Sequence, residues 1–413
     1  MLPSSFLFLA TTLPLASAQA QSLLQAIGNI SSLSNFTAFY RANEISANLL
    51  FNNPSSWPIT VLVPNNQAFA AYFQKTNRSL ANLSPQELLP LIQYHSLVSS
   101  LGAENFTAPS DGAGSGIGTT VPTLLAEGPS NNRTAGAALA SKFGGVDRAK
   151  GQVVFIRPSA STSNTKRFIL SNRQNPGPSS SIRSGLQTNV NVQVIDPQQG
   201  TWAGGRFHVI DGLLTLPDLC SKTIRGAGLT GLDNALNRSS LWPTLDSSTN
   251  VTCLGPSNEA FRSAGNPDGT LNATQLQSAL LFHTLPEVAY SDYLTNGQEF
   301  TSIQGAKVKV KIEGTGSNRV IYFNNAKLIE ANVLTNNGLM HIIDGVMSPN
   351  GTPSATPSST PSSTTSRGTA SATNSKAAAP NFADGYIGWS AVYMLGFLIL
   401  ADIMGLGALG LRF

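Results

Sequence analysis

Four histidines are the residues of this sequence best suited to chemistry. His95 and His283 lie on the apolar faces of predicted helices, whereas His208 and His341 lie in apolar strands. Histidines in such repeated positions could bind a metal ion. However, no cysteine or carboxylate lies at ligand spacing beside them. We therefore interpret all four as structural side chains with internal hydrogen bonds, and we predict no metal site.

Two aspartates form the next candidate group. Asp211 and Asp344 each follow a histidine by three residues, in the pattern His-x-Ile-Asp-Gly. Acid–base catalysis would need a second group and a pocket, so a carboxylate that caps a turn is the favoured interpretation. The sequence also contains no Gly-x-Ser-x-Gly, His-Glu-x-x-His or P-loop motif. We predict a protein without enzymatic activity and without a cofactor.

The chain has two cysteines, Cys220 and Cys253. An even count in an oxidising compartment favours a disulfide between them. Closing a loop of about 33 residues would contribute on the order of 3–4 kcal/mol in the chain-entropy model. The alternative is a pair of buried free thiols, because Cys253 occupies a position equivalent to Val61, which faces inward from a predicted strand.

An internal repeat positions these residues. Three blocks occur twice in the same order: Thr60–Phe69 matches Thr252–Phe261, Gln93–Leu97 matches Leu281–Leu285, and Gly205–Leu214 matches Gly338–Met347. The interval between the two histidines is 113 residues in the first copy (208 − 95) and 58 in the second (341 − 283). The first copy therefore carries an insertion of about 55 residues. We expect its Gly-, Ser- and Asn-rich parts, 109–150 and 158–185, to form surface loops.

Local patterns predict the elements of each copy. A short apolar strand ends at Pro64, and Asn65 and Ser257 stand at helix N-cap positions. Capping boxes open later helices at Ser84–Glu87 and Asn272–Gln275. Strict alternation over Lys307–Glu313 predicts a half-buried strand, and Arg319–Phe323 is its returning partner. Helices followed by antiparallel strands predict an α+β domain, present twice.

Composition restricts the class of protein. The 413 residues suffice for two domains and accessory segments. Hydrophobic residues make up 41%, enough for buried cores, but charged residues make up only 11%. The net charge of +4 is not gathered into a basic cluster, so we predict no nucleic-acid binding.

The two ends carry targeting patterns. Residues 1–21 contain an apolar stretch before Ala16-Ser17-Ala18 and predict a secretory signal peptide. Domains are expected at 22–216 and 217–348, followed by a Ser/Thr/Pro-rich stalk with the attachment region at 349–385. The apolar tail, 386–413, is typical of a glycosylphosphatidylinositol (GPI) signal, with Asn374 or Ser375 as the attachment residue. The alternative is a single-pass transmembrane helix.

Asn-x-Ser/Thr sequons are frequent, and ten of them in a chain with a signal peptide favour a glycosylated ectodomain. They are Asn29, Asn35, Asn77, Asn82, Asn105, Asn132, Asn237, Asn250, Asn272 and Asn350.

The three repeated blocks resemble the signatures of the FAS1 (fasciclin) domain family. The resemblance covers both predicted domains and implies a wedge-like β-sandwich with short helices. It also implies a non-enzymatic adhesion or matrix protein of the fungal or plant surface type. Where animal members carry an Asp-Ile integrin-binding motif, this chain reads Ala331-Asn332-Val333-Leu334. The family's Tyr-His pair is kept as Tyr94-His95, which makes the first domain the better candidate for binding.

Three functional hypotheses remain at this stage. The first is an adhesion glycoprotein that contacts cell-wall or matrix glycans or surface proteins and is held at the membrane by its GPI anchor. The second is a structural spacer without a specific partner. The third is a module that binds a small ligand between the two domains.

Overall fold

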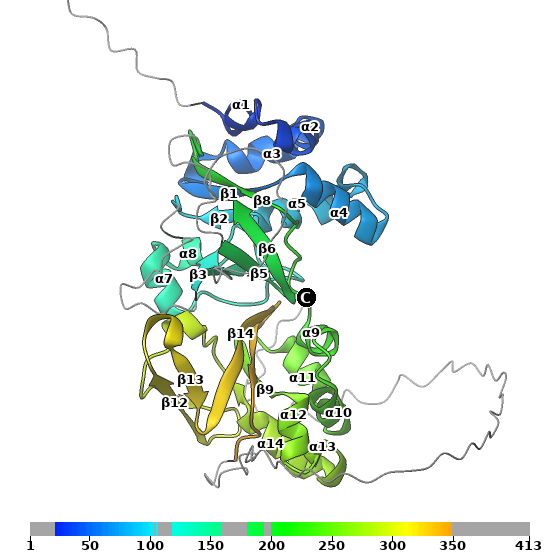
Figure 1. Ribbon diagram of the computed structural model, residues 1–413, viewed down its shortest axis with the longest axis vertical. Coiled ribbons are helices and arrows are strands. Elements are labelled where there is room, and N and C mark those ends of the chain that lie inside the picture. The colour runs from blue at the N-terminus through cyan, green and yellow to red at the C-terminus, as the bar shows by residue number, and fades with distance from the viewer. Residues whose placement is uncertain (1–20, 103–104, 106–117, 159–179, 194–199, 349–413) are drawn as a thin grey trace, which may run out of the picture. The chain divides into compact units, whose positions relative to one another are not determined.

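The computed structural model describes residues 21–102, 105, 118–158, 180–193 and 200–348 (Figure 1). The first repeat begins with helices and continues into strands. Its helices are α1 (Leu23–Ile27), α2 (Ser34–Ala42), α3 (Glu44–Phe51), α4 (Asn66–Thr76), α5 (Pro85–Tyr94), α7 (Ala137–Phe143) and α8 (Val146–Ala149). Its strands are β1 (Ile59–Pro64), β2 (Ser96–Val98), β3 (Thr119–Pro122), β4 (Val153–Pro158), β5 (Ser180–Ser184), β6 (Gln187–Gln193), β7 (Thr201–Trp202) and β8 (Gly205–Ile210).

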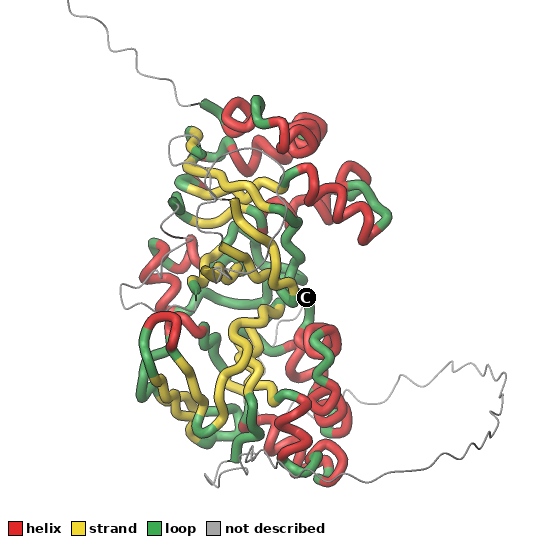
Figure 2. The backbone as a smooth tube through the Cα atoms, viewed as in Figure 1, coloured by secondary structure: helices red, strands yellow, loops and turns green. Residues whose placement is uncertain are grey.

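The second repeat has the same plan in a shorter chain (Figure 2). Its helices are α9 (Cys220–Gly226), α10 (Thr230–Arg238), α11 (Trp242–Ser247), α12 (Asn258–Ser263), α13 (Pro267–Thr270), α14 (Ala273–Phe282) and the 3-10 turn η4 (Ser291–Tyr293). Its strands are β9 (Val251–Pro256), β10 (Thr284–Leu285), β11 (Glu299–Thr301), β12 (Lys307–Glu313), β13 (Val320–Phe323), β14 (Ala326–Thr335) and β15 (Gly338–Ile343). The α+β fold predicted from the sequence is confirmed.

Each repeat forms one mixed sheet. The main strand orders are β2-β1-β8-β6-β5-β4-β3 and β10-β9-β15-β14-β13-β12-β11. The expectation of antiparallel strands is wrong for one pair in each sheet, because β1 and β8 are parallel, as are β9 and β15. A parallel pair requires a long crossover, and the rest of each repeat supplies it. The first and last repeated blocks of the sequence are therefore neighbours in space.

The last repeated block begins with a glycine in both copies, and the parallel strand pairing requires this residue. Gly205 pairs with Ile59 and Gly338 with Val251, at the start of the parallel pairs. Their φ angles are +137° and +157°. A Cβ atom would lie 2.1 Å from the Ile59 carbonyl oxygen in one repeat and 2.0 Å from that of Val251 in the other. Only glycine permits this close approach of two backbones.

The local predictions of helix starts are confirmed. Asn65 accepts a hydrogen bond from the Ala68 backbone N–H at 2.9 Å, and Ser257 makes the equivalent bond. Both capping boxes are formed, at the starts of α5 and α14. Strand β12 has the predicted bounds, and its side chains alternate between buried and exposed up to Val310.

The central strands have separate cores on their two faces. In β1, Ile59, Val61 and Val63 contribute to a cluster with the N-terminal helices, whereas Leu62 faces a second cluster. In β9, Cys253 and Leu254 divide between two clusters in the same way. Strands that are buried on both faces have nearly continuous apolar sequences, which is why Thr60 is the only polar residue of β1.

The insertion differs from its prediction. Residues 118–150 were expected to be surface loops, but they include β3 and the two helices α7 and α8. Val121 and Leu139 are each only 1% exposed. The apolar residues within this Gly-rich segment extend the first sheet and its core. The described end of the second expected loop also differs from its prediction, because Ser180–Ser184 forms the mostly buried strand β5. Residues 109–117 and 159–179 of the two expected loops lie outside the described residues.

Candidate functional site

His95 lies inside the first repeat at the end of α5. The Leu214 backbone N–H donates to its Nε2 at 3.0 Å, and its Nδ1 lies 2.8 Å from the Leu91 carbonyl oxygen. A backbone N–H can only donate, so Nε2 accepts and Nδ1 carries the proton. His283 makes the same pair of contacts in the second repeat. Burial lowers the pKa of both imidazoles to about 4.

The strand histidines are also held by backbone groups. His341 Nδ1 accepts from the Asn332 N–H at 3.2 Å, and its Nε2 lies 2.8 Å from the Ala289 carbonyl oxygen. Its pKa is lowered to about 4, mainly by burial. His208 Nε2 lies 2.9 Å from the Leu101 carbonyl oxygen. These contacts are those of structural histidines.

The Tyr94-His95 pair is not placed for direct binding. Tyr94 is fully buried and His95 is 5% exposed. The Tyr94 hydroxyl donates to the Val153 carbonyl oxygen at 2.9 Å and so ties α5 to β4. The binding role that the sequence suggested for this pair does not fit these positions, because neither side chain can reach a partner without opening the core.

Removing the Tyr94 hydroxyl is expected to affect stability and not attachment. The Tyr94→Phe variant leaves the Val153 carbonyl without this donor, which costs about 1–3 kcal/mol of unfolding free energy. Urea unfolding measures this loss, with Tyr72→Phe on α4, whose side chain is half-buried, as a control expected to be neutral. A loss of cell attachment by Tyr94→Phe at unchanged stability would contradict the structural role.

The two aspartates after the strand histidines link neighbouring strands. Asp211 accepts from the Asn191 N–H at 2.8 Å and from its side-chain amide at 2.7 Å. Asp344 accepts from the Lys327 N–H at 2.7 Å. Both carboxylates therefore accept hydrogen bonds from backbone N–H groups of the adjacent strand. They cap backbone donors, as predicted, but those donors lie on a neighbouring strand and not in a local turn.

Cys220 and Cys253 are free thiols in the structure, so the expected disulfide is absent from it. Both side chains are buried in the same apolar cluster of the second repeat. Burial raises the pKa of Cys253 to about 12. Burial also raises the pKa of Cys220. The pair acts as small apolar core residues, which is the alternative that the strand position of Cys253 had offered.

Each repeat has an apolar pocket at the equivalent place, beside His95 and beside His283. Their open volumes are about 30 and 50 Å³. This is room for a few water-sized groups and too little for a sugar ring. Among the described residues, no group of three or more His, Cys, Asp or Glu could hold a metal ion.

Side-chain hydrogen bonds join the two repeats. Asp292 on η4 accepts from the Thr120 N–H at 2.7 Å and from its hydroxyl at 2.6 Å. Asp292 is 9% exposed, and burial raises its pKa although the bonds from Thr120 act to lower it. The Gln152 side-chain amide reaches the carbonyl oxygens of Thr335 and Asn336 at 3.2 and 3.3 Å.

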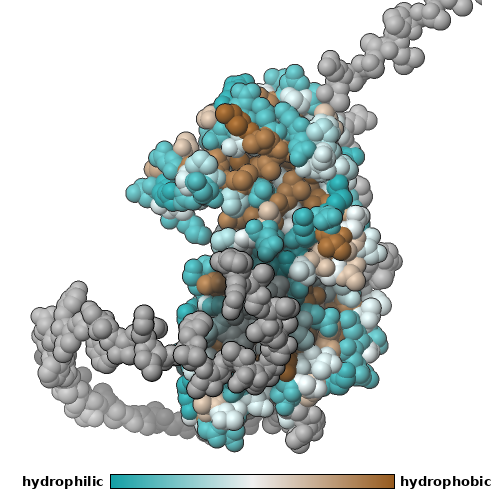
Figure 3. Space-filling model, turned by 180° about the vertical axis from the view of Figure 1, so that it is seen from behind, coloured by the Kyte–Doolittle hydropathy of each residue, from teal (hydrophilic) through white to brown (hydrophobic). Residues whose placement is uncertain are grey.

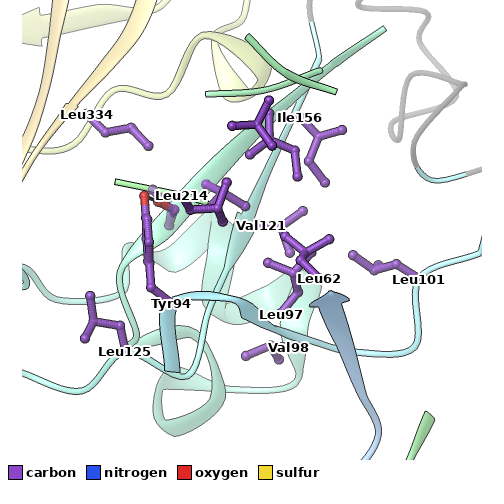
Figure 4. Packing of buried hydrophobic residues seen from close by; sticks show 14 of the residues in the cluster. Leu62, Tyr94, Leu97, Val98, Leu101, Val121, Leu125, Ile156, Leu214 and Leu334 are labelled. Carbon is purple, nitrogen blue, oxygen red and sulfur yellow. Dashed lines mark hydrogen bonds between the residues drawn. The ribbon is translucent and has the colours of Figure 1, made fainter. Parts of the chain in front are cut away.

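An apolar layer continues across the same junction. Tyr290, Leu334 and Leu339 of the second repeat belong to the hydrophobic cluster of the first. Figure 4 shows Leu334 in this cluster with Tyr94, Leu214 and Val121. The segment that replaces the integrin-binding motif is thus turned inward, because Asn332, Val333 and Leu334 are 0–2% exposed.

These features define a protein of two α+β repeats. Its four repeated histidines and the junction residue Asp292 form internal hydrogen bonds that stabilise the fold. A family model of the fasciclin domain matches residues 31–135 and 227–349. The chain belongs to the fasciclin domain family.

Two fungal relatives have similar sequences. A fasciclin-like arabinogalactan protein of Arthroderma benhamiae is 30% identical over 168 residues, 40% of this chain and 38% of that protein. A fasciclin-like arabinogalactan protein of Cercospora beticola is 29% identical over 146 residues, 35% of this chain and 38% of that protein. The chain thus matches less than two fifths of the length of these curated relatives.

A solved FAS1 domain pair from the insect cell adhesion molecule Fasciclin I is a weak structural match. It has 13% sequence identity and a TM-score of 0.34, and the match covers 77% of this chain and 98% of that one. Within the described ranges, no helix has the length and apolar character to cross a membrane. The predicted signal peptide, stalk, attachment residues and apolar tail lie outside the described residues.

Proposed function

We propose that this protein is a non-enzymatic cell-surface adhesion glycoprotein that contacts cell-wall or matrix glycans or surface proteins. The observation that supports it best is the tandem fasciclin fold, in which the histidines and junction carboxylate are used for packing. Nine sequon asparagines lie within the described residues, and six of them are exposed, as a glycosylated surface requires: Asn29, Asn35, Asn77, Asn82, Asn237 and Asn272.

The proposed location is the outer cell surface. A signal peptide over residues 1–21 and a GPI signal with attachment at Asn374 or Ser375 would place the two domains there. Treating intact cells with a phosphatidylinositol-specific phospholipase C is expected to release the protein with the glycan and inositol phosphate of its anchor, while the lipid stays in the membrane. Persistence in the membrane would favour a single-pass helix instead.

The helices of the first repeat are the favoured contact surface. Ile45 and Leu49 on α3 are 82% and 70% exposed, and Phe73 on α4 is 53% exposed. Figure 3 shows apolar residues at the surface of this repeat. Ile45 and Leu49 lie one helical turn apart, so they share one face of α3. Neighbouring exposed apolar groups are typical of interaction surfaces.

Beads coated with the folded ectodomain are expected to attach to cells or wall polymers, and the double variant Ile45→Ser/Leu49→Ser to attach at least several-fold less. Ile329→Ser in the second repeat is the matched control, because Ile329 is also exposed, at 53%. Attachment by neither wild type nor variants would favour the structural spacer, the second candidate function.

A further inference from the structure

One sequon faces the other repeat at the junction. Asn250 precedes β9, and Thr134, the last residue of the Asn132 sequon, lies opposite it. The Thr134 N–H donates to Asn250 Oδ1 at 2.8 Å, and Asn250 Nδ2 donates to Thr134 Oγ1 at 2.7 Å. We call these two bonds the Asn250–Thr134 clasp.

The orientation of the Asn250 amide in the clasp is fixed by chemistry. The Thr134 backbone N–H can only donate, so the atom facing it must be Oδ1 and not Nδ2. Both bonds go to one residue, so the hydrogen that Nδ2 donates is the one on the side of Oδ1.

N-glycosylation would replace that same hydrogen. The sugar carbon bonds to Nδ2, which makes the amide secondary, and a trans secondary amide holds its nitrogen substituent on the side of the carbonyl oxygen. In Asn250 this position is occupied by Thr134 Oγ1, only 2.7 Å from Nδ2. A glycan at Asn250 and the clasp are therefore incompatible.

Other contacts at the same place keep the two repeats close. The Asn132 N–H donates to the Asn336 carbonyl oxygen at 2.6 Å, and the Asn336 side-chain amide donates to the Pro129 carbonyl oxygen at 3.1 Å. The clasp thus lies at the edge of a junction that is already closed by backbone contacts, so Thr134 cannot simply move away from a sugar.

We infer that Asn250 is not glycosylated, although it lies in a sequon. Its side chain instead forms the Asn250–Thr134 clasp, which closes the junction between the two repeats. Its neighbours in sequence make the contrast testable, because Asn237 and Asn272 belong to the same repeat and are exposed. The inference does not depend on the adhesive function.

Glycopeptide mapping of the full chain, secreted from an N-glycosylating host, tests the modification. Enzymatic deglycosylation in H₂¹⁸O is expected to label Asn237 and Asn272 and to leave Asn250 unlabelled. Occupancy of Asn250 comparable with that of Asn237 would overturn the inference.

A pair of variants tests the role of the clasp. Asn250 has a φ of +57°, so Asn250→Gly removes the side chain without backbone strain. Asn250→Gly is expected to keep the glycan mass of the wild type and to lower the midpoint of thermal unfolding. Asn237→Ala is expected to lose one glycan and keep the midpoint. Loss of a glycan from Asn250→Gly, or an unchanged midpoint, would contradict the clasp.

Discussion

Lowering the pH from 7 toward 4 is expected to remove most of the folding stability of the two repeats. Three buried histidines cause this loss. The pKa of His95, His283 and His341 is about 4 in the folded chain, against an ordinary value of 6.5. Burial disfavours the charged imidazolium, and each ring already uses a nitrogen to accept a backbone hydrogen bond.

The direction of the effect follows from these values. Between pH 6.5 and 4 the unfolded chain binds a proton at each histidine and the folded chain does not. Stability is therefore full above about pH 6.5 and falls as the pH decreases toward 4. Three additional protons on the unfolded chain correspond to a slope of about 4 kcal/mol per pH unit within this window, or roughly 10 kcal/mol from pH 6.5 to pH 4. A typical domain has only about 5–15 kcal/mol in total.

Two carboxylates modify this profile. The raised pKa of Asp292 has the opposite effect, because the folded chain binds this proton more readily as the pH falls. Glu87 has its pKa lowered to about 2, chiefly by its hydrogen bond with Arg78. The stability linked to Glu87 is lost only below about pH 4.5, outside most of the histidine window.

Urea unfolding at several pH values between 4.5 and 7.5 measures the slope. The His95→Gln variant should be less stable at neutral pH and should lose about a third of the slope, because it no longer titrates. A wild-type slope below about 1 kcal/mol per pH unit, or an unchanged slope in His95→Gln, would show that the histidines are charged in the fold.

The second large effect is expected from Leu334→Ala. Leu334 belongs to β14 of the second repeat, but its fully buried side chain packs in the cluster of the first. The substitution removes buried methyl groups and leaves a cavity, at a cost of about 2–5 kcal/mol. Because the cavity lies in the shared cluster, backbone amides of β3 and β4 should exchange with deuterium faster, although the change is in the other repeat.

Val310→Ala is the matched control for this experiment. Val310 is also fully buried, but in a cluster formed by the second repeat alone. Hydrogen exchange followed by mass spectrometry should show faster exchange near β12 and little change in β3 and β4. If Leu334→Ala also left β3 and β4 unchanged, the apolar layer across the junction would not stabilise the first repeat.

Several features could be predicted from the sequence because they depend on neighbours along the chain. A capping box needs only residues three positions apart, and those at Ser84 and Asn272 formed as expected. The alternation of Lys307–Glu313 predicted β12 with its bounds. The repeated blocks predicted two copies of one α+β domain, because a buried core restricts the same positions in each copy.

Other features depend on pairing between distant segments. Nothing local distinguishes a parallel neighbour from an antiparallel one, so the pairing of β1 with β8 was missed. Tyr94 was predicted to bind because it belongs to the Tyr-His pair of the family, and a sequence pattern does not show that the packing of α5 against β4 buries it. The prediction of a disulfide between Cys220 and Cys253 was wrong for the same reason. The number of residues between two cysteines does not determine whether their thiols have the geometry of a bond.

The sequence by itself determined the family, the doubled domain, the helix starts and the internal role of the four histidines. Only the tertiary structure decided how the two copies meet. Thr120 and Asp292 are 172 residues apart in the sequence. Asn250 has the same Asn-x-Ser/Thr motif as the asparagines that are exposed. Whether such a side chain meets solvent or another repeat is set by the packing of both domains, which no local pattern contains.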